Sequence, residues 1–202
     1  MSNTPLSEFF KDGTRAQHEL LDTRIMALSP FADRERYALF VRTQARLQRV
    51  ASPLFQSEQL GQWLPDLAGR DRLAAVLADC ADLGVTAEAL EEDRLATAGV
   101  SVSDDYAALG WLYTVEGSNL GAAFLLKHAK SQLELSETFG ARHLAGHDDG
   151  RGLHWRRFKD TMDGLELSAE QRQRALQGAL DAFMLAREGV EALLAGVAAE
   201  AV

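Results

Sequence analysis

One histidine near the start of the chain is placed to bind a metal ion. His18 lies in the middle of a helix that we expect over residues 5–26, with Lys11 seven residues before it and Asp22 four residues after it. Helical geometry puts these three side chains on one face, within about 40°. The carboxylate of Asp22 can accept a ring N–H of His18, directly or through a water molecule, which is the usual support of a metal-bound imidazole. Without a metal, the same pattern describes a partly exposed histidine in an amphipathic helix.

Three glycines share one face of the longest predicted helix, over residues 103–131. Gly110, Gly117 and Gly121 lie seven and four residues apart, which places them within about 40° of each other. Each glycine costs a helix interior about 1 kcal/mol relative to alanine, so a compensating contact is expected. The smooth face indicates either close helix packing or a groove for a flat ligand. A kink at Gly117 and Ser118 would turn backbone groups toward such a ligand.

The elements that must position these two helices are themselves helical. Helix-forming residues dominate, β-branched residues are sparse, and all four prolines lie in the first 65 residues. The apolar periodicity predicts an all-α fold, with helices over 5–26, 33–52, 71–83, 103–131, 153–163 and 168–197, and connections over 57–70, 84–102 and 140–153.

Capping residues mark the starts of two of these helices. Ser101 or Ser103 is expected to cap the longest helix, and Ser168 with Gln171 three residues on forms a plausible capping box. The connection at 84–102 is expected to contain only a turn of helix. No linker interrupts the pattern, so residues 1–202 are expected to form a single domain.

The composition excludes several classes of function. The chain has 21 basic and 30 acidic residues, a net charge of −9, and phosphate binding favours a basic surface instead. A single cysteine allows no intrachain disulfide. No segment is typical of a signal peptide or a transmembrane helix. We therefore expect a cytoplasmic protein that binds neither nucleic acid nor membranes.

The His18 helix and the glycine-rich segment 116–125 together resemble the bacterial heme oxygenases. The resemblance covers nearly the whole chain and includes the turn Pro30-Phe31-Ala32, the segment 139–144, and Trp155 with Asp163-Gly164. It implies a heme-oxygenase-like helical bundle with heme between the first helix and a kinked long helix. It also implies an enzyme that cleaves heme b to biliverdin, CO and ferrous iron, using O₂ and electrons from an external reductant.

The resemblance assigns roles to the two chemical groups already described. His18 would be the axial ligand of the heme iron, supported by Asp22 where many relatives have glutamate. Gly117, Ser118 and Gly121 would form the distal, catalytic wall, where only small residues admit O₂ and steer it toward one carbon of the macrocycle. Such a site needs little acid–base chemistry from side chains, because the heme supplies the reactive atoms.

Heme orientation decides which biliverdin isomer is released. Lys11 and Tyr113 match positions that hold a heme propionate in members selective for the IXα isomer, so the resemblance implies IXα. Rotated relatives carry a lysine where this chain has His128, and an imidazole is a weaker propionate clamp. Further propionate contacts could come from this imidazole or from Arg156, Arg157 or Lys159, and the sequence does not choose among them.

Partners and alternatives follow from the same resemblance. The electron donor would be a ferredoxin or a flavoprotein reductase, and the product would serve iron acquisition or supply a phytochrome with its chromophore. One alternative is a heme carrier or sensor of the same fold without turnover. Others are a heme-free enzyme of the same helical superfamily, of the thiamine-degrading or quinone-cofactor-synthesis kind, and a plain helical interaction module.

The remaining candidates are interpreted mainly as structural. Arg42, Arg46 and Arg49 form a basic stripe with no acidic neighbour on their helix face, so they could dock an acidic electron donor, although a solvated face is the commoner case. A metal site is disfavoured for His143 and His147, which lie in a predicted loop. His154 is expected to be a surface or packing residue, and Cys80 a small buried apolar residue.

Overall fold

Helices provide nearly all of the regular structure in the computed structural model, which describes residues 4–196. Within those residues the chain forms eight α-helices and no β-strand, which confirms the all-α prediction. They are α1 (Leu6–Ala27), α2 (Arg34–Phe55), α3 (Glu58–Trp63), α4 (Leu73–Asp82), α5 (Ala87–Thr97), α6 (Asp105–Leu133), α7 (Arg151–Asp163) and α8 (Ala169–Val190). Three short turns join them: η1 (Leu67–Arg70), η2 (Arg142–Leu144) and a π-helical turn, η3 (Glu191–Ala195). The predicted end of the last helix, at residue 197, lies outside the described residues.

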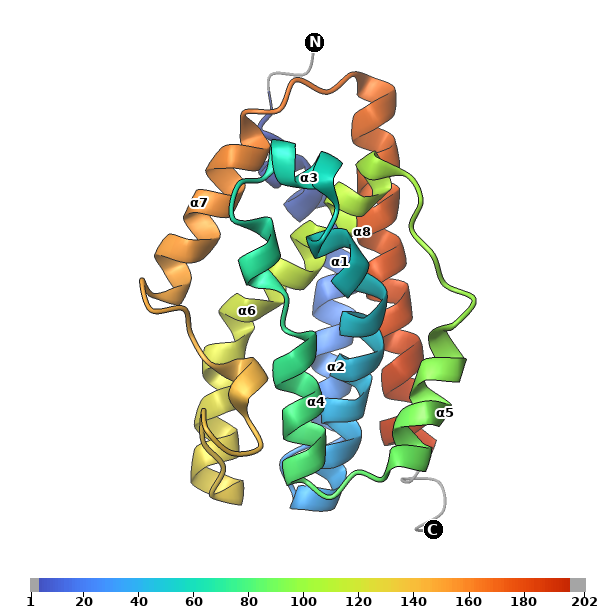
Figure 1. Ribbon diagram of the computed structural model, residues 1–202, viewed down its shortest axis with the longest axis vertical. Coiled ribbons are helices and arrows are strands. Elements are labelled where there is room, and N and C mark those ends of the chain that lie inside the picture. The colour runs from blue at the N-terminus through green and yellow to red at the C-terminus, as the bar shows by residue number, and fades with distance from the viewer. Residues whose placement is uncertain (1–3, 197–202) are drawn as a thin grey trace.

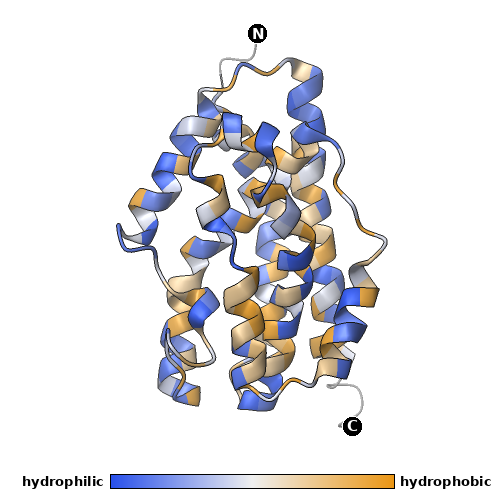
Figure 2. Ribbon diagram, viewed as in Figure 1, coloured by the Kyte–Doolittle hydropathy of each residue, from blue (hydrophilic) through white to orange (hydrophobic). Residues whose placement is uncertain are grey.

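The last long helix, α8, supports both helices that carry the candidate site. It packs on α6 along much of its length and on α1, whereas α1 and α6 make few contacts with each other (Figure 1). Hydrophobic residues recur along the long helices (Figure 2), and the buried ones make up the core. They form two clusters, one around Phe10, Leu109 and Met162, the other around Tyr37 and Phe40.

Close backbone contact between α6 and α8 explains one of the three aligned glycines. A Cβ atom added to Gly110 would collide with the backbone carbonyl of Ala175, and one added to Gly178 would collide with that of Ala107. The two helices therefore meet through a reciprocal pair of glycines. At Gly110 the helix-packing interpretation is correct and the groove interpretation is wrong.

The long helix α6 begins at Asp105 and changes direction near its middle (Figure 1). Its N-cap is Asp104, whose side chain accepts a hydrogen bond from the backbone N–H of Ala107 at 2.8 Å. The prediction of Ser101 or Ser103 as the cap is therefore wrong by one to three residues.

The capping box at the start of α8 is confirmed. The Ser168 hydroxyl accepts from the backbone N–H of Gln171 at 3.2 Å, and the Gln171 side chain accepts from the backbone N–H of Ser168 at 2.7 Å.

Segment 84–102 holds a complete helix, α5, which the sequence analysis missed. Asp93 of α5 is fully buried and accepts hydrogen bonds from Arg42 Nε at 2.8 Å and from Arg46 Nε at 2.7 Å. The side chains of these two arginines are only 13% and 14% exposed. The basic stripe therefore does have an acidic neighbour, and these two arginines do not form a docking surface.

The predicted connection 57–70 likewise contains the short helix α3 and the turn η1. Among residues 4–196, no helix is both long enough and apolar enough to cross a lipid bilayer.

Candidate functional site

The imidazole of His18 is exposed on α1 and oriented by two neighbours. Its Nδ1 atom lies 3.2 Å from the Asp22 carboxylate, so the contact is direct. The ring of Phe183, on α8, meets the imidazole edge to face with centroids 6.0 Å apart. Because Nδ1 faces Asp22, Nε2 is the nitrogen left to coordinate a metal. The His18 side chain is 59% exposed, so that nitrogen can be reached.

The second half of α6 presents an open surface around Gly117 and Gly121. A Cβ atom added to Gly121 would meet no atom within 4 Å, and one added to Gly117 would touch only the Trp155 ring, at 3.5 Å. Ser118 is exposed, and its hydroxyl donates to the carbonyl of Val115 at 2.7 Å. Such local hydrogen bonding of serine to the backbone is associated with bent helices.

Large apolar side chains flank these small residues. Leu120 is 45% exposed and Phe124 is 54% exposed, although both are strongly apolar. A reachable imidazole nitrogen on α1, together with small residues and uncovered apolar side chains on α6, fits a flat, largely apolar group that carries a metal ion. The described side chains thus satisfy the chemical requirements of a heme.

Tyr113 lies on α6 one turn before Gly117, in an aromatic cluster. Its ring is 5.0 Å from that of Phe10 and 5.5 Å from that of Trp155. Burial, with smaller contributions from Asp163 and Asp12, raises the pKa of Tyr113 to about 12. The phenol therefore stays protonated at neutral pH and can donate a hydrogen bond. Lys11 is exposed on α1.

The other proposed propionate contacts differ in whether their side chains already have partners within the protein. His128 stacks on Phe31 with centroids 5.3 Å apart, and its Nδ1 lies 3.0 Å from the amide nitrogen of Gln132. The imidazole thus already contacts Phe31 and Gln132. Of the three proposed contacts on α7, Arg157 pairs with Asp149, Lys159 lies over Trp155 at 5.9 Å from the ring centroid, and Arg156 is exposed.

A buried ion pair behind Gly117 was missed by the sequence analysis. Glu116 and Arg70 are 2% and 5% exposed, and their side chains are joined by a 2.6 Å hydrogen bond. Burial raises the pKa of Glu116, against the opposing effect of Arg70. One signal could have revealed it: Glu116 lies four and seven residues after Leu112 and Leu109, on the apolar face of the helix, where a carboxylate needs a partner.

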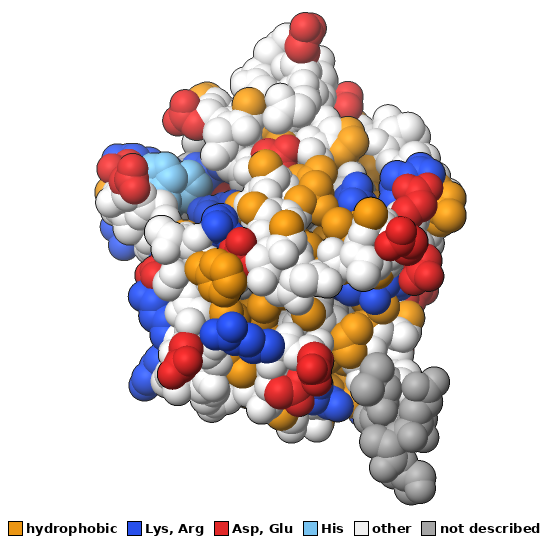
Figure 3. Space-filling view, turned by 60° about the horizontal axis from the view of Figure 1, so that its bottom comes forward, with side chains coloured by type: hydrophobic (Ala, Val, Ile, Leu, Met, Phe, Trp, Pro, Cys, Tyr) orange, Lys and Arg blue, Asp and Glu red, His pale blue; other side chains and the backbone are white. Residues whose placement is uncertain are grey.

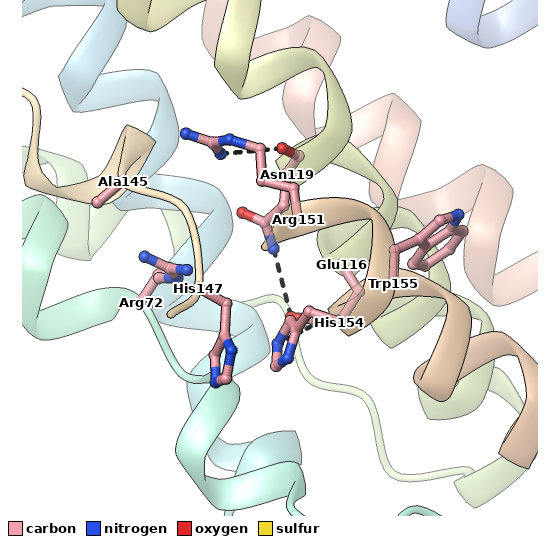
Figure 4. A pocket seen from close by; sticks show the side chains of 8 residues that line it. All are labelled: Arg72, Glu116, Asn119, Ala145, His147, Arg151, His154 and Trp155. Carbon is pink, nitrogen blue, oxygen red and sulfur yellow. Dashed lines mark hydrogen bonds and ion pairs between the residues drawn. The ribbon is translucent and has the colours of Figure 1, made fainter. Parts of the chain in front are cut away.

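The hollow beside this ion pair is lined by two of the four histidines of the second half of the chain, His147 and His154 (Figure 4). His154 Nε2 lies 3.8 Å from the Glu116 carboxylate, and its ring stacks on that of His147 with centroids 4.0 Å apart. Burial and the nearby positive charges of Arg70 and other groups lower the pKa of His154 to about 4. The packing role expected for His154 is therefore confirmed, next to a polar hollow.

His143 and Cys80 have structural environments of their own. The Nδ1 atom of His143 lies 2.7 Å from the buried carboxylate of Asp79, away from His147. Cys80 is fully buried, and burial raises the pKa of its thiol to about 12, so it is a small apolar residue as expected. Across the part of the chain that the structure describes, no group of three or more His, Cys, Asp or Glu residues could hold a metal ion.

Comparison with known proteins gives one consistent result. The family model described as heme oxygenase matches residues 4–192. Heme oxygenase PigA of Pseudomonas aeruginosa is 42% identical over 170 residues, which cover 84% of this chain and 83% of that protein. The heme oxygenase of Neisseria meningitidis, solved with NO and CO bound, has a TM-score of 0.82 and 33% identity over 95% of this chain and 92% of that one. Heme oxygenase-1 of the cyanobacterium Synechocystis, solved with heme, shares the fold, with a TM-score of 0.71 and 14% identity over 97% of this chain and 96% of that one.

Proposed function

The chain belongs to the heme oxygenase family and is a heme oxygenase, and on this premise we propose that His18 binds the heme iron and that the product is biliverdin IXα. The direct contact between His18 and Asp22 carries the first part of the proposal. The extent of the family match, residues 4–192, supports one domain over the whole of residues 1–202.

His18 acts as the proximal ligand through Nε2. The Asp22 carboxylate, 3.2 Å from Nδ1, would favour the neutral tautomer that carries its proton on Nδ1 and would leave Nε2 to bind iron. Phe183 limits rotation of the ring from the α8 side. A neutral imidazole suits an iron that must bind O₂ and later be released.

Gly117, Ser118 and Gly121 form the distal wall. Bound heme supplies both the iron that activates O₂ and the macrocycle that is cleaved. The role of this wall is steric. The open space at Gly121 admits a small molecule, and the Trp155 ring limits the space at Gly117. No strong base stands among these three residues, so they direct the site of attack rather than transfer protons.

Lys11 and Tyr113 hold the propionates and thereby select the IXα isomer. The protonated phenol of Tyr113 donates to a carboxylate, and Lys11 provides a positive charge on the opposite helix. The rotated seating is disfavoured because His128 is already stacked on Phe31 and bonded to Gln132. Of the α7 residues, Lys159 is the best additional contact, since it lies over the ring that touches Tyr113.

An external donor supplies the electrons, and a ferredoxin or a flavoprotein reductase has the required chemistry. The IXα isomer favours the supply of chromophore to a phytochrome, with iron acquisition as the other use of the reaction.

An optical titration with hemin, followed by ascorbate in air, tests the assignment of His18. We expect a saturable one-to-one Soret band that decays to a biliverdin spectrum, and chromatography should identify IXα. His18→Ala should shift the band and stop turnover, whereas Glu19→Ala, on the adjacent exposed position, should change neither. An unaltered Soret band in His18→Ala would remove His18 as the ligand.

The isomer assignment has a separate test. Combining Lys11→Ala with Tyr113→Phe should allow heme to bind in more than one orientation, so that β or δ biliverdin appears beside the α isomer. A product of the parent protein that is mainly β or δ would contradict the proposed roles of both residues.

A further inference from the structure

The hollow behind the distal wall carries more positive than negative charge. It is lined by eight residues that come from the start of α4, from α6, from the loop before α7 and from α7: Arg72, Glu116, Asn119, Ala145, His147, Arg151, His154 and Trp155 (Figure 4). With Arg70 behind it, three guanidinium groups face this region against the single carboxylate of Glu116. That carboxylate is already hydrogen-bonded to Arg70 at 2.6 Å.

The two guanidinium groups that line the hollow have no carboxylate partner among residues 4–196. Arg151 donates to two backbone carbonyls, of Asn119 at 3.1 Å and of Leu144, and its nearest favourable carboxylate, Glu137, makes no ion pair with it within 4.0 Å. Arg72 is half-buried, and no described carboxylate lies within 4.0 Å of it. A partly enclosed cation without a counter-charge is costly, and a mobile anion is the simplest compensation.

Neighbouring groups respond to this excess of positive charge. Burial and the charge of Arg72 lower the pKa of Arg151. Burial and then Arg70, His147 and Arg72 lower the pKa of His154 to about 4. The His147 side chain is 40% exposed, so the hollow can be reached from solvent. Figure 3 shows histidine side chains among basic and acidic groups on the surface of the molecule.

We propose that this hollow is a binding site for a small monovalent inorganic anion, with chloride as the representative ligand, held between the guanidinium groups of Arg72 and Arg151. Its volume of about 10 Å³ is the lower limit for one water molecule, so only a small ligand can enter. A chloride ion is larger than a water molecule and enters only when Arg72 and His147 at the rim move outward. A phosphate or a porphyrin carboxylate is too large.

The position of the site gives the anion an influence on the distal wall. Trp155 lines the hollow and is the side chain nearest to Gly117, 3.5 Å from an added Cβ atom. Glu116 directly precedes Gly117 in α6. The anion would therefore place a negative charge on the far side of the wall from the substrate, although its binding does not depend on heme.

Thermal unfolding of the protein without heme tests the proposal. Sodium chloride is compared with sodium gluconate at equal ionic strength, so that general screening is the same in both series. We expect the melting temperature to rise with chloride and to saturate, as it does for a ligand that binds only the folded state. Arg72→Gln should raise the chloride dissociation constant at least about tenfold, the factor expected for loss of one charged hydrogen bond. Arg156→Gln, an exposed arginine of α7 outside the hollow, should leave it unchanged.

Three results would overturn the proposal. One is equal melting temperatures in chloride and gluconate, and another is an equal chloride response in the parent and Arg72→Gln. The third is a chloride response that rises without saturation, as a general salt effect does. A crystal grown in sodium bromide gives an independent measurement. We expect an anomalous peak between Arg72 and Arg151, and peaks only elsewhere would mean an adventitious ion only.

Discussion

The contact between His18 and Asp22 contributes little to the stability of the fold, although the proposed heme site depends on it. Both side chains are largely exposed, at 59% and 64%. An exposed pair of this kind adds little to folding stability. Under the proposed assignment, its importance is for the bound iron, because the carboxylate would set the orientation and basicity of the imidazole. An aspartate proves long enough to make this contact without a bridging water.

Asp22→Ala should therefore weaken heme binding without unfolding the protein. We expect a loss of affinity of about 10- to 100-fold, the usual cost of removing a partner of a metal-bound histidine. The iron–histidine stretching band of the ferrous complex, measured by resonance Raman spectroscopy, should move to lower frequency. Asp22→Glu should restore most of both properties, and a band at the parent frequency in Asp22→Ala would show that the carboxylate has no such role.

At the scale of the element, α6 has two halves with different requirements. Its first half needs Gly110 because the backbone of α8 occupies the space of a side chain. In its second half, no backbone of another helix lies near the position of a side chain at Gly117 or Gly121. The three glycines therefore share one helix face for two different reasons.

Gly110→Ala and Gly121→Ala should have opposite effects on stability. The first should lower the free energy of unfolding by about 1–3 kcal/mol or more, as overpacking does. The second should raise it by up to about 1 kcal/mol, because alanine is the better helix former and meets no neighbour. Denaturant unfolding measures both. The same Gly121→Ala should reduce the rate of heme turnover, since it adds bulk to the proposed distal wall.

The sequence predicted the longer helices that have an apolar stripe and missed α5, whose buried face is polar, as well as the short α3. α5 buries Asp93 and Thr97 rather than apolar residues, and ion pairs with α2 hold it in place. No periodicity search for apolar residues could detect it. In the same way, His18 and the glycines were found from local spacing. The pair of Arg70 and Glu116, 46 positions apart, depends on the tertiary fold.

At the scale of the whole molecule, buried carboxylates fasten distant segments to each other. Asp79 of α4 is fully buried and accepts hydrogen bonds from the backbone N–H groups of Arg142 and His143 and from the His143 ring. Burial alone would raise the pKa of Asp79, but these hydrogen bonds outweigh it and the pKa is lowered. The loop before α7 is thereby fixed to α4.

Asp79 should make the protein sensitive to acid. A carboxyl group with a lowered pKa in the folded state stabilises fully above its unfolded pKa, about 3.8 for Asp79, and this contribution is lost as the pH falls through the folded pKa. Asp79→Asn should lower the free energy of unfolding at pH 7 by about 1.5–3 kcal/mol. The free energy of unfolding should then fall less steeply below pH about 4 than it does in the parent. Melting temperature against pH measures both. Glu137→Gln, in an exposed ion pair at the same loop, should stay within about 0.5 kcal/mol of the parent at pH 7.

The pair of Arg70 and Glu116 fastens η1 to the middle of α6. Arg70→Met should lower the free energy of unfolding by about 3–5 kcal/mol, because it leaves the Glu116 carboxylate buried without a partner. Adding Glu116→Gln should recover a large part of that loss. Additive effects in this double-mutant cycle would show that the two side chains are not coupled.

The helix that carries His18 is held by residues that are synthesised much later. Arg24 of α1 pairs with Glu191, 167 positions further along the chain, and the ring beside His18 belongs to Phe183. Because α1 is synthesised first, it can pack in its final position only after α8 has been synthesised. Under the proposed role of His18, a growing polypeptide therefore has an incomplete heme site until α8 has emerged.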